Sequence, residues 1–367
     1  MVDSSDVLFF FGAGASAPFG IPTMKQFVID FETFLEKNGT EMEKKVYSNI
    51  KEVLGNYLKK EVDLEDIFTV IDGLINFNYE RLGLLSVYYF NEHLLHPSYS
   101  IEANISTYEG LREKFQDFIK EKCLIPKNSF TEISTVYQDF FNKIYEKSNS
   151  WSSDIHKGEN CKYCTTWSMF TTNYDVCLEY YWREKARIPL NTGFHTDEIR
   201  KTQILNSKLF FENGRNSERP KLIKLHGSIN WLIESDGTIT EQLNIPTYTF
   251  VDRKYIGELM VYPIQQKELY IEPYIPMFYQ LNDELKNKSN WIIIGYSFND
   301  PVIREIFLKN SNEKKNIILV HPHANEIKNE KLKDIKCKKF SCLEKKFGMH
   351  QDYQVVNKSI ADFMMVA

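Results

Sequence analysis

The chain has little that would place it in a membrane or on a nucleic acid. No apolar run among its 367 residues is long enough to span a bilayer. The apolar run Val7–Phe11 is too short for the core of a signal peptide, and acidic rather than basic residues precede it. The formal net charge is −5, without the basic excess that is usual in nucleic-acid-binding proteins. We therefore expect a cytoplasmic protein with no membrane partner and no direct nucleic-acid partner.

Cysteine is also scarce, and its spacing does not complete a metal site. The chain has six cysteines, and a disulfide framework is not expected in a long cytosolic protein. Cys161 and Cys164 have the spacing of half a zinc site, but no second pair follows at a matching distance. Cys337 and Cys342 are too widely spaced for a tight half-site. The sequence favours free thiols over zinc, and no metal is expected.

Short apolar segments alternate with helical ones along much of the chain. Each predicted strand ends in a glycine-rich or polar turn, which is typical of a doubly wound parallel sheet. The predicted fold class is therefore α/β, a Rossmann-like parallel sheet with helices on both faces. Strands are predicted at Val7–Phe11, Trp167–Thr171, Leu222–Leu225, Trp291–Ile294 and Asn316–Val320, with weaker candidates at 209–211 and 248–263, and helices at 24–35, 175–185 and 301–308.

A small-residue loop, Gly12–Ala17, follows the first strand directly and fits the G-x-G-x-x-A form of the dinucleotide fingerprint. Small residues let the backbone approach a pyrophosphate, and amides at a helix start attract its charge. Glycines also make ordinary tight turns, so both interpretations remain open for the loop alone. Pro18 and Pro22 interrupt the helix that a dehydrogenase would continue from this loop. The loop therefore does not predict an ordinary dehydrogenase.

The middle of the chain predicts a second structural region. From about residue 40 to 148, apolar and charged residues alternate at helical spacing, and helix starts are predicted at Asp63 and Ser129. We expect residues 1–30 and 150–367 to form the Rossmann-like domain. Residues 31–149 are expected to form a largely helical domain inserted in it.

Four segments in order resemble motifs of the sirtuin-like superfamily, and they cover the Rossmann-like part but not the helical block. The first is the loop Gly12–Ser16 with residues 20–22 after it. The others are Thr171–Asp175, Lys224–Trp231 and Gly295–Pro301, each at the end of a predicted strand. The resemblance implies that the protein binds NAD⁺ and uses it as a substrate.

Two departures from the deacylating sirtuins narrow the resemblance. Residues 23–25 are Thr-Met-Lys where those enzymes carry an acidic-aromatic-basic run, and residues 232–260 lack the cysteines of their zinc module. The pattern looks more like the zinc-less bacterial antiphage-defence branch, whose members hydrolyse NAD⁺. That branch implies a homo-oligomer and, as candidate partners, a hexameric HerA-type ATPase or a short Argonaute.

The resemblance assigns catalysis to Asn173 and His226. Histidine suits a base toward water or a ribose hydroxyl, because its ordinary pKa lies near neutrality. An asparagine amide both donates and accepts, so it can hold that water or the ribose. The cofactor-binding residues that the motifs imply are Gly12, Ala13, Gly14, Ser16, Pro22, Thr23, Thr172, Asp175, Gly295, Ser297, Asn299 and His321.

Structural interpretations of the same residues stay open. His226 alone fits a hydrogen-bonding role at a strand end, and Asn173 or Asp175 fits a helix cap. Asp300 is interpreted as a cap before Pro301, and Trp231 as a core residue. Residues 271–276 fit a stiff loop that lines the nicotinamide end or simply lies at the surface. The competing functions are an NAD⁺-dependent protein deacylase or ADP-ribosyltransferase, and a non-catalytic module that senses NAD or ADP-ribose.

Overall fold

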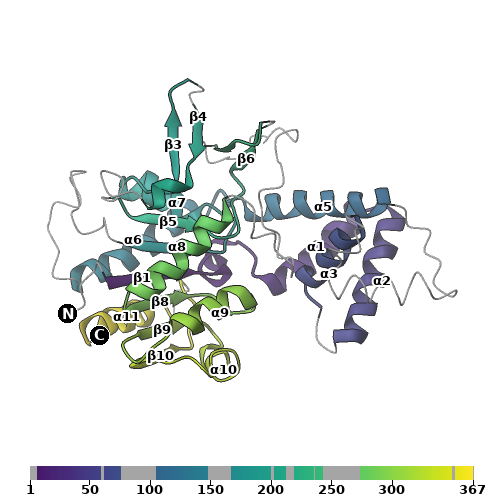
Figure 1. The fold of residues 1–367 in the computed structure, drawn as a ribbon. Coiled ribbons are helices and arrows are strands. Elements are labelled where there is room, and N and C mark those ends of the chain that lie inside the picture. The colour runs from purple at the N-terminus through teal and green to yellow at the C-terminus, as the bar shows by residue number, and fades with distance from the viewer. Residues whose placement is uncertain are drawn as a thin grey trace. The chain divides into compact units, whose positions relative to one another are not determined.

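The structure is a computed structural model, and its ribbon is drawn in Figure 1. It describes residues 6–58, 62–75, 105–147, 167–199, 202–211, 219–234, 236–242, 273–348 and 352–366. These residues form two compact units. The first contains Met1–Ile21, Leu124–Met260 and Leu269–Ala367, and the second contains Pro22–Cys123. We call them the sheet unit and the helical unit.

A parallel sheet of six strands forms the centre of the sheet unit. In chain order the strands are β1 (Val7–Phe11), β2 (Ser168–Thr171), β5 (Lys221–Lys224), β8 (Asn290–Ile294), β9 (Asn316–Val320) and β10 (Lys339–Leu343). Their spatial order is β10-β9-β8-β1-β2-β5, and every neighbouring pair is parallel. This is the strand order of the Rossmann-type doubly wound fold, as the sequence predicted.

The order of the strands also fixes where a ligand is expected. After β1 the chain builds outward through β2 and β5 on one side, and later through β8, β9 and β10 on the other. The topological switch point therefore lies between β1 and β8. Ligands of doubly wound sheets bind outside the carboxyl ends of the strands at this point. The loops after Phe11 and Ile294 leave the sheet there.

The first strand explains why both faces of the sheet are covered. All five residues of β1 are buried, and alternate side chains point to opposite faces. Phe9 and Phe11 contact Phe140 of α6 (Phe130–Lys147) edge-on, with ring centroids 6.2 Å and 6.4 Å apart. Phe10 contacts Phe307 of α9 (Pro301–Asn310) on the other face, at 5.3 Å. One aromatic strand thus anchors a helix on each side of the sheet.

Further elements of the sheet unit complete the layers and flank the sheet. They include the short helix α7 (Cys177–Tyr180), which continues as the π-helical turn η6 (Tyr181–Ala186). The helices α8 (Tyr274–Asn287), α10 (Ala324–Glu330) and α11 (Tyr353–Val366) follow along the chain. A separate four-stranded antiparallel sheet has the order β3-β4-β7-β6, with bounds Phe194–Asp197, Thr202–Leu205, Ile239–Glu241 and Trp231–Ile233.

Aromatic rings connect the described helices of the helical unit, which are labelled in Figure 1. Its helices are α1 (Met24–Asn38), α2 (Glu41–Leu58), α3 (Leu64–Ile75) and α5 (Ile105–Cys123). Phe31 of α1 contacts Phe68, Phe115 and Phe118 with ring centroids 5.2 to 5.7 Å apart. Asp63 accepts the amide of Asp66 at 2.9 Å, which confirms the predicted helix start.

Several predictions about elements are confirmed. The strands at Val7, Ser168, Lys221, Asn290 and Asn316 stand where the apolar runs placed them, within a residue or two. The interruption after the glycine loop is also confirmed. Two 3₁₀ turns, η2 (Ala13–Ala15) and η3 (Ala17–Phe19), replace a continuous helix before α1 begins at Met24.

Other predictions need correction. Residues 207–210 form a 3₁₀ turn, not part of a strand, because Asn206 accepts the amide of Lys208 at 3.1 Å and closes the chain locally. Tyr274 to Pro276 open helix α8 instead of forming a stiff loop, since proline is compatible with the first turn of a helix. The candidate strand at 248–263 and the loop residues 271–272 lie outside the described residues.

The boundary of the helical block differs as well. The sequence placed residues 130–147 in the helical block, but α6 packs on the sheet unit through Phe140 and Phe141, which contact Phe9. Its helical periodicity is shared by any amphipathic helix and does not say which core it covers. That the helical unit is an inserted domain stays a prediction. Within the described residues, no helix is long and apolar enough to cross a membrane.

Candidate functional site

The loops after β1 and β8 approach each other so closely that only glycine fits between them. A Cβ atom on Gly12 would lie 2.7 Å from the Gly295 carbonyl oxygen, and one on Gly14 would lie 2.8 Å from the Gly295 Cα. Gly295 itself has φ +65, and a Cβ there would lie 2.4 Å from the Ala15 nitrogen. Contact between the loops alone therefore requires these three glycines, independently of any ligand.

Most amides of the first loop are used inside the protein. The Gly12 amide donates to Ile294 at 2.8 Å, and the Gly14 amide donates to Gly295 at 2.9 Å. The Ala15 and Ser16 amides donate to Gly12 and Ala13 within the 3₁₀ turn. A pyrophosphate at this loop therefore depends on close approach to its small residues, rather than on these four amides.

Asn173 lies two residues after β2 and joins two strand ends. Its Nδ2 donates to the Gly12 carbonyl and to the Ser16 hydroxyl, each at 3.0 Å, and its backbone amide donates to the Thr171 hydroxyl at 3.0 Å. An amide group has two N–H donors, and both are occupied by these contacts. In this arrangement Asn173 can serve a water or a ribose hydroxyl only as an acceptor, through Oδ1.

Ser16 and Tyr137 form the support beneath Asn173. Ser16 is 1% exposed, and its hydroxyl also bonds to the fully buried Tyr137 of α6. Burial raises the pKa of Tyr137 well above its ordinary value, so this phenol stays protonated. Sequence reasoning missed Tyr137, because nothing in its helical spacing separates it from the neighbouring core aromatics.

The other predicted residues of the second motif have structural contacts. The Thr172 amide donates to the Phe11 carbonyl at 3.3 Å and so continues the ladder between β1 and β2. Asp175 is 4% exposed, and its Oδ1 accepts the Cys177 amide at 3.0 Å in the first turn of α7. Asn173 does not cap this helix, which begins four residues later. The N-cap position itself is Val176, so Asp175 bonds to the first turn from one residue before the cap.

His226 follows β5, the strand beside β2, and faces a carboxylate. Its Nε2 lies 3.3 Å from Asp300 Oδ2, and the two side chains are 9% and 7% exposed. The Tyr174 ring lies beside the imidazole, with centroids 6.5 Å apart. From the sequence, Asp300 was interpreted only as a helix cap. It was missed as a partner of His226, because only the fold joins positions so far apart in the chain.

A buried lysine fixes the backbone around both predicted catalytic residues. Lys224 is 3% exposed, and its Nζ lies 2.9 Å from Glu179 Oε1 and also donates to the Asp175 carbonyl. The Ser228 hydroxyl donates to the Tyr174 carbonyl at 3.2 Å. These bonds tie the loop after β2 to the loop after β5, so Asn173 and His226 are held on neighbouring, mutually bonded loops.

The loop after β8 is held by a second lysine. Lys331 donates to the Ser297 carbonyl at 3.0 Å and to the side-chain oxygen of Asn299. Phe298 between them has φ +57, a strained value for a bulky residue, and its ring is fully buried. Burial, followed by repulsion from Arg304, lowers the pKa of Lys331. The predicted ligand residues Ser297 and Asn299 are thus both hydrogen-bonded to Lys331.

His321 follows β9 and stays neutral near pH 7. Burial lowers its pKa from 6.5 to about 4, and the nearby His323 and Lys331 add to the shift. Its Nδ1 accepts the His323 amide at 3.0 Å, so the proton of the neutral ring lies on Nε2. His321 is therefore suited to donate one hydrogen bond to a hydroxyl, but it carries no charge for a phosphate.

Two groups of predicted residues are not placed at this site. Pro22 and Thr23 belong to the helical unit, where the Thr23 carbonyl accepts the Phe27 amide at 2.9 Å, and their ligand role stays a prediction. Cys161 and Cys164 lie outside the described residues. No group of three or more metal-binding side chains occurs in the part of the chain that is described.

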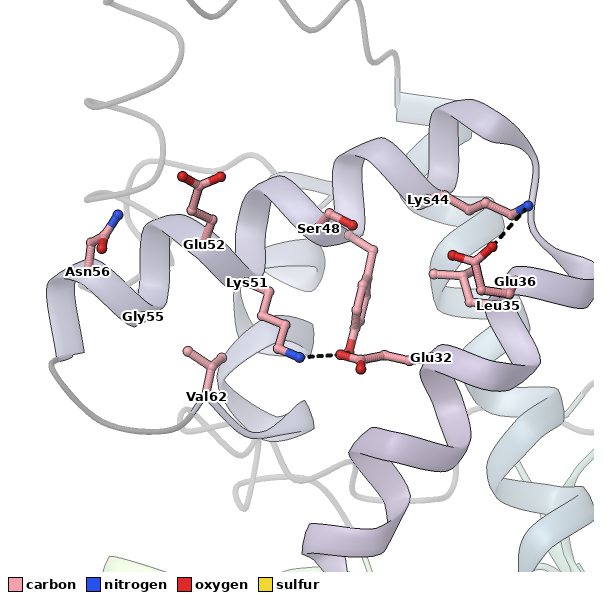
Figure 2. A pocket seen from close by; sticks show the side chains of 11 residues that line it. Glu32, Leu35, Glu36, Lys44, Ser48, Lys51, Glu52, Gly55, Asn56 and Val62 are labelled. Atoms are coloured by element: carbon pink, nitrogen blue, oxygen red, sulfur yellow. Dashed lines mark hydrogen bonds and ion pairs between the residues drawn. The ribbon is translucent and has the colours of Figure 1, made fainter.

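The helical unit contains a separate hollow of about 640 Å³ that Figure 2 shows between α1 and α2. Two of its lining lysines pair with carboxylates, Lys51 with Glu32 and Lys44 with Glu36, and Glu52 also lines it. None of its lining residues belongs to the predicted site.

Comparison with known proteins adds one family match. Residues 168–341 match the sequence profile of a family described as the SIR2-like domain, a range that runs from β2 into β10. It includes Asn173, His226 and Gly295 but not the Gly12 loop. The match supports the resemblance to sirtuin-like proteins. No curated protein matches the chain.

Two solved structures are similar to the chain at low identity. A Sir2 homologue in complex with ADP-ribose is 13% identical, with 98% of this chain and 91% of that chain covered and a TM-score of 0.38. A Sir2 homologue in complex with 2′-O-acetyl ADP-ribose is 12% identical, with 98% and 93% covered and a TM-score of 0.38. The fold assignment rests on this chain's own strand order.

Proposed function

We propose that the protein is an NAD⁺ hydrolase that cleaves the bond between nicotinamide and ribose, giving nicotinamide and ADP-ribose. The strongest support is the position of Asn173 and His226: both are largely buried, and they lie on bonded loops after the neighbouring strands β2 and β5. The SIR2-like match spans both residues, and Asn173 bonds to Gly12 of the loop at the switch point.

The proposed chemistry needs little acid catalysis for the leaving group. Nicotinamide is bound as a cationic pyridinium and departs neutral, taking the electrons of the C1′–N1 bond. A water adds to C1′ of the oxocarbenium-like ribose, and its proton passes to His226 and then to solvent. Asn173 Oδ1 accepts a hydrogen bond from that water or from a ribose hydroxyl, since both of its donors hold the Gly12–Ser16 loop.

The test is chromatography of NAD⁺ after incubation with the purified protein, alone and with a HerA-type ATPase or a short Argonaute. We expect nicotinamide and ADP-ribose in equal amounts. His226→Ala and Asn173→Ala should each lower turnover about 100-fold or more. Matched controls are His195→Ala on β3 and Asn287→Ala at the end of α8, both exposed and outside the site. Full turnover in His226→Ala would contradict the mechanism.

The biological setting is part of the same proposal. We infer antiphage defence through NAD⁺ depletion, by a homo-oligomer held inactive until a partner signals infection. Support comes from the sequence departures from deacylating sirtuins. The described part of the region after His226 is a β-hairpin, β6 and β7, where the deacylases carry their zinc module. Deacylation of an acyl-peptide in step with NAD⁺ use would instead favour a deacylase.

A further inference from the structure

Asp300 serves a helix and a histidine at the same time. Its Oδ1 accepts the amides of Val302 and Ile303, at 2.9 Å and 3.3 Å, and so caps α9. Its Oδ2 lies 3.3 Å from His226 Nε2. The helix therefore holds the carboxylate in one orientation, and the second oxygen is directed at the imidazole.

The position of α9 makes this orientation rigid. Pro301 occupies the first turn with a fixed φ, and the side chains of Ile303 and Phe307 are fully buried under the sheet. Asp300 is itself 7% exposed, so little water competes for its oxygens. A carboxylate held in this way acts on the histidine more precisely than one on a mobile loop.

The geometry has a chemical consequence for the histidine. An ionised carboxylate can only accept, so the ring nitrogen that faces it carries the proton. In the neutral imidazole the lone pair then lies on Nδ1. The carboxylate also stabilises the imidazolium that forms when the ring takes up a second proton.

We propose that Asp300 is a positioning residue that holds His226 in its Nε2–H tautomer, so that the ring accepts the proton of the reaction through Nδ1. The tautomer is inferred from the 3.3 Å contact between Nε2 and Oδ2. Its use in the reaction rests on the proposed NAD⁺ hydrolysis. The competing role for Asp300 is that of a helix cap alone.

Asp300→Asn separates the two roles. Asparagine caps helices as well as aspartate does, so Oδ1 still accepts the Val302 and Ile303 amides. Its Nδ2 then faces His226 Nε2 as a donor, which forces Nε2 to accept and moves the ring proton to Nδ1. Asp300→Ala removes both roles. Asp63→Asn, at the start of α3, is the matched control, because it makes the same change at a helix start in the helical unit.

The experiment combines ¹⁵N-histidine NMR with kinetics on the full chain, and His226→Ala identifies the resonance. We expect an Nε2–H tautomer in the wild type and an Nδ1–H tautomer in Asp300→Asn. Turnover of NAD⁺ by Asp300→Asn should fall about 100-fold with KM within about twofold. Its melting temperature should stay near the wild-type value, whereas that of Asp300→Ala falls.

Two results would overturn the proposal. One is an Nδ1–H tautomer in the wild type. The other is an Asp300→Asn variant with unchanged tautomer and turnover, which would leave Asp300 as a cap only. The NMR measurement needs no substrate, so it tests the tautomer independently of activity. Failure of the chain to hydrolyse NAD⁺ would refute the proposed function but not the tautomer.

Discussion

The side-chain amide of Asn173 donates to the Ser16 hydroxyl at 3.0 Å and thereby joins the loop after β2 to the loop after β1. A residue expected to act on substrate thus also fixes the loop expected to receive the dinucleotide. The same hydroxyl bonds to Tyr137 on the helix beneath. Substitution of Ser16 can therefore show whether this residue supports Asn173 or contacts a phosphate of the substrate directly.

Ser16→Ala should lower turnover more than it raises KM. Loss of the hydroxyl leaves one Asn173 donor and the Tyr137 phenol without this partner, at a cost of about 1 to 2 kcal/mol of unfolding free energy. Steady-state kinetics and urea denaturation measure the two effects. Ser129→Ala, just before α6, serves as a control away from the strand ends. A rise in KM with unchanged kcat would instead mean that Ser16 contacts the phosphate of the substrate.

Gly295→Ala should destabilise the protein far more than Gly237→Ala. Both glycines have a positive φ, so each alanine carries a backbone cost of about 1 to 2 kcal/mol. At Gly295 the added Cβ also meets backbone atoms of Gly14 and Ala15 at 2.4 Å, whereas at Gly237 nothing lies within 4 Å. We expect a loss of about 3 kcal/mol or more at Gly295. Equal melting temperatures of the two variants would show that the loops can separate.

The pKa of His321 predicts a pH dependence of stability. The folded-state pKa is about 4 against an ordinary 6.5, so between these values the unfolded chain binds more protons. Stability is therefore fully present above pH 6.5 and is lost as the pH falls toward 4. We expect about 1 to 2 kcal/mol, since water screens a half-buried ring. Urea denaturation at several pH values measures it, and His321→Gln should flatten the curve. An unchanged slope in that variant would contradict the assignment.

Lys331→Met should weaken binding of NAD⁺ rather than slow its cleavage. Lys331 holds the Ser297 carbonyl and the Asn299 side chain, so its loss frees the loop that is expected to contact ribose or phosphate. We expect KM to rise about fivefold, which corresponds to a loss of about 1 kcal/mol of binding free energy. The value of kcat should stay within about twofold of the wild type. The exposed Lys333 offers the matched control Lys333→Met. A fall in kcat alone would instead place Lys331 near the reacting bond.

Predictions that depended on buried apolar runs succeeded, because such runs specify a parallel strand from local sequence. Val7–Phe11 and Asn316–Val320 are fully buried strands at their predicted positions. The hairpin of β3 and β4 was missed, because exposed side chains leave it without an apolar pattern. Helix α8 was missed because Pro273 before it and Pro276 within it suggested a loop, although its buried residues include Met277 and Leu281.

The sequence by itself determined the class of fold, the strands at the switch point and the polar motifs at their ends, because hydrophobic period and small residues act locally. It could not determine what those motif residues contact. Asp300 and His226 are 74 positions apart in the chain, and only the sheet order brings Oδ2 within 3.3 Å of Nε2. Likewise, Gly12 and Gly14 must be glycines because Gly295 lies against them across the switch point. This constraint exists only once β1 and β8 are paired.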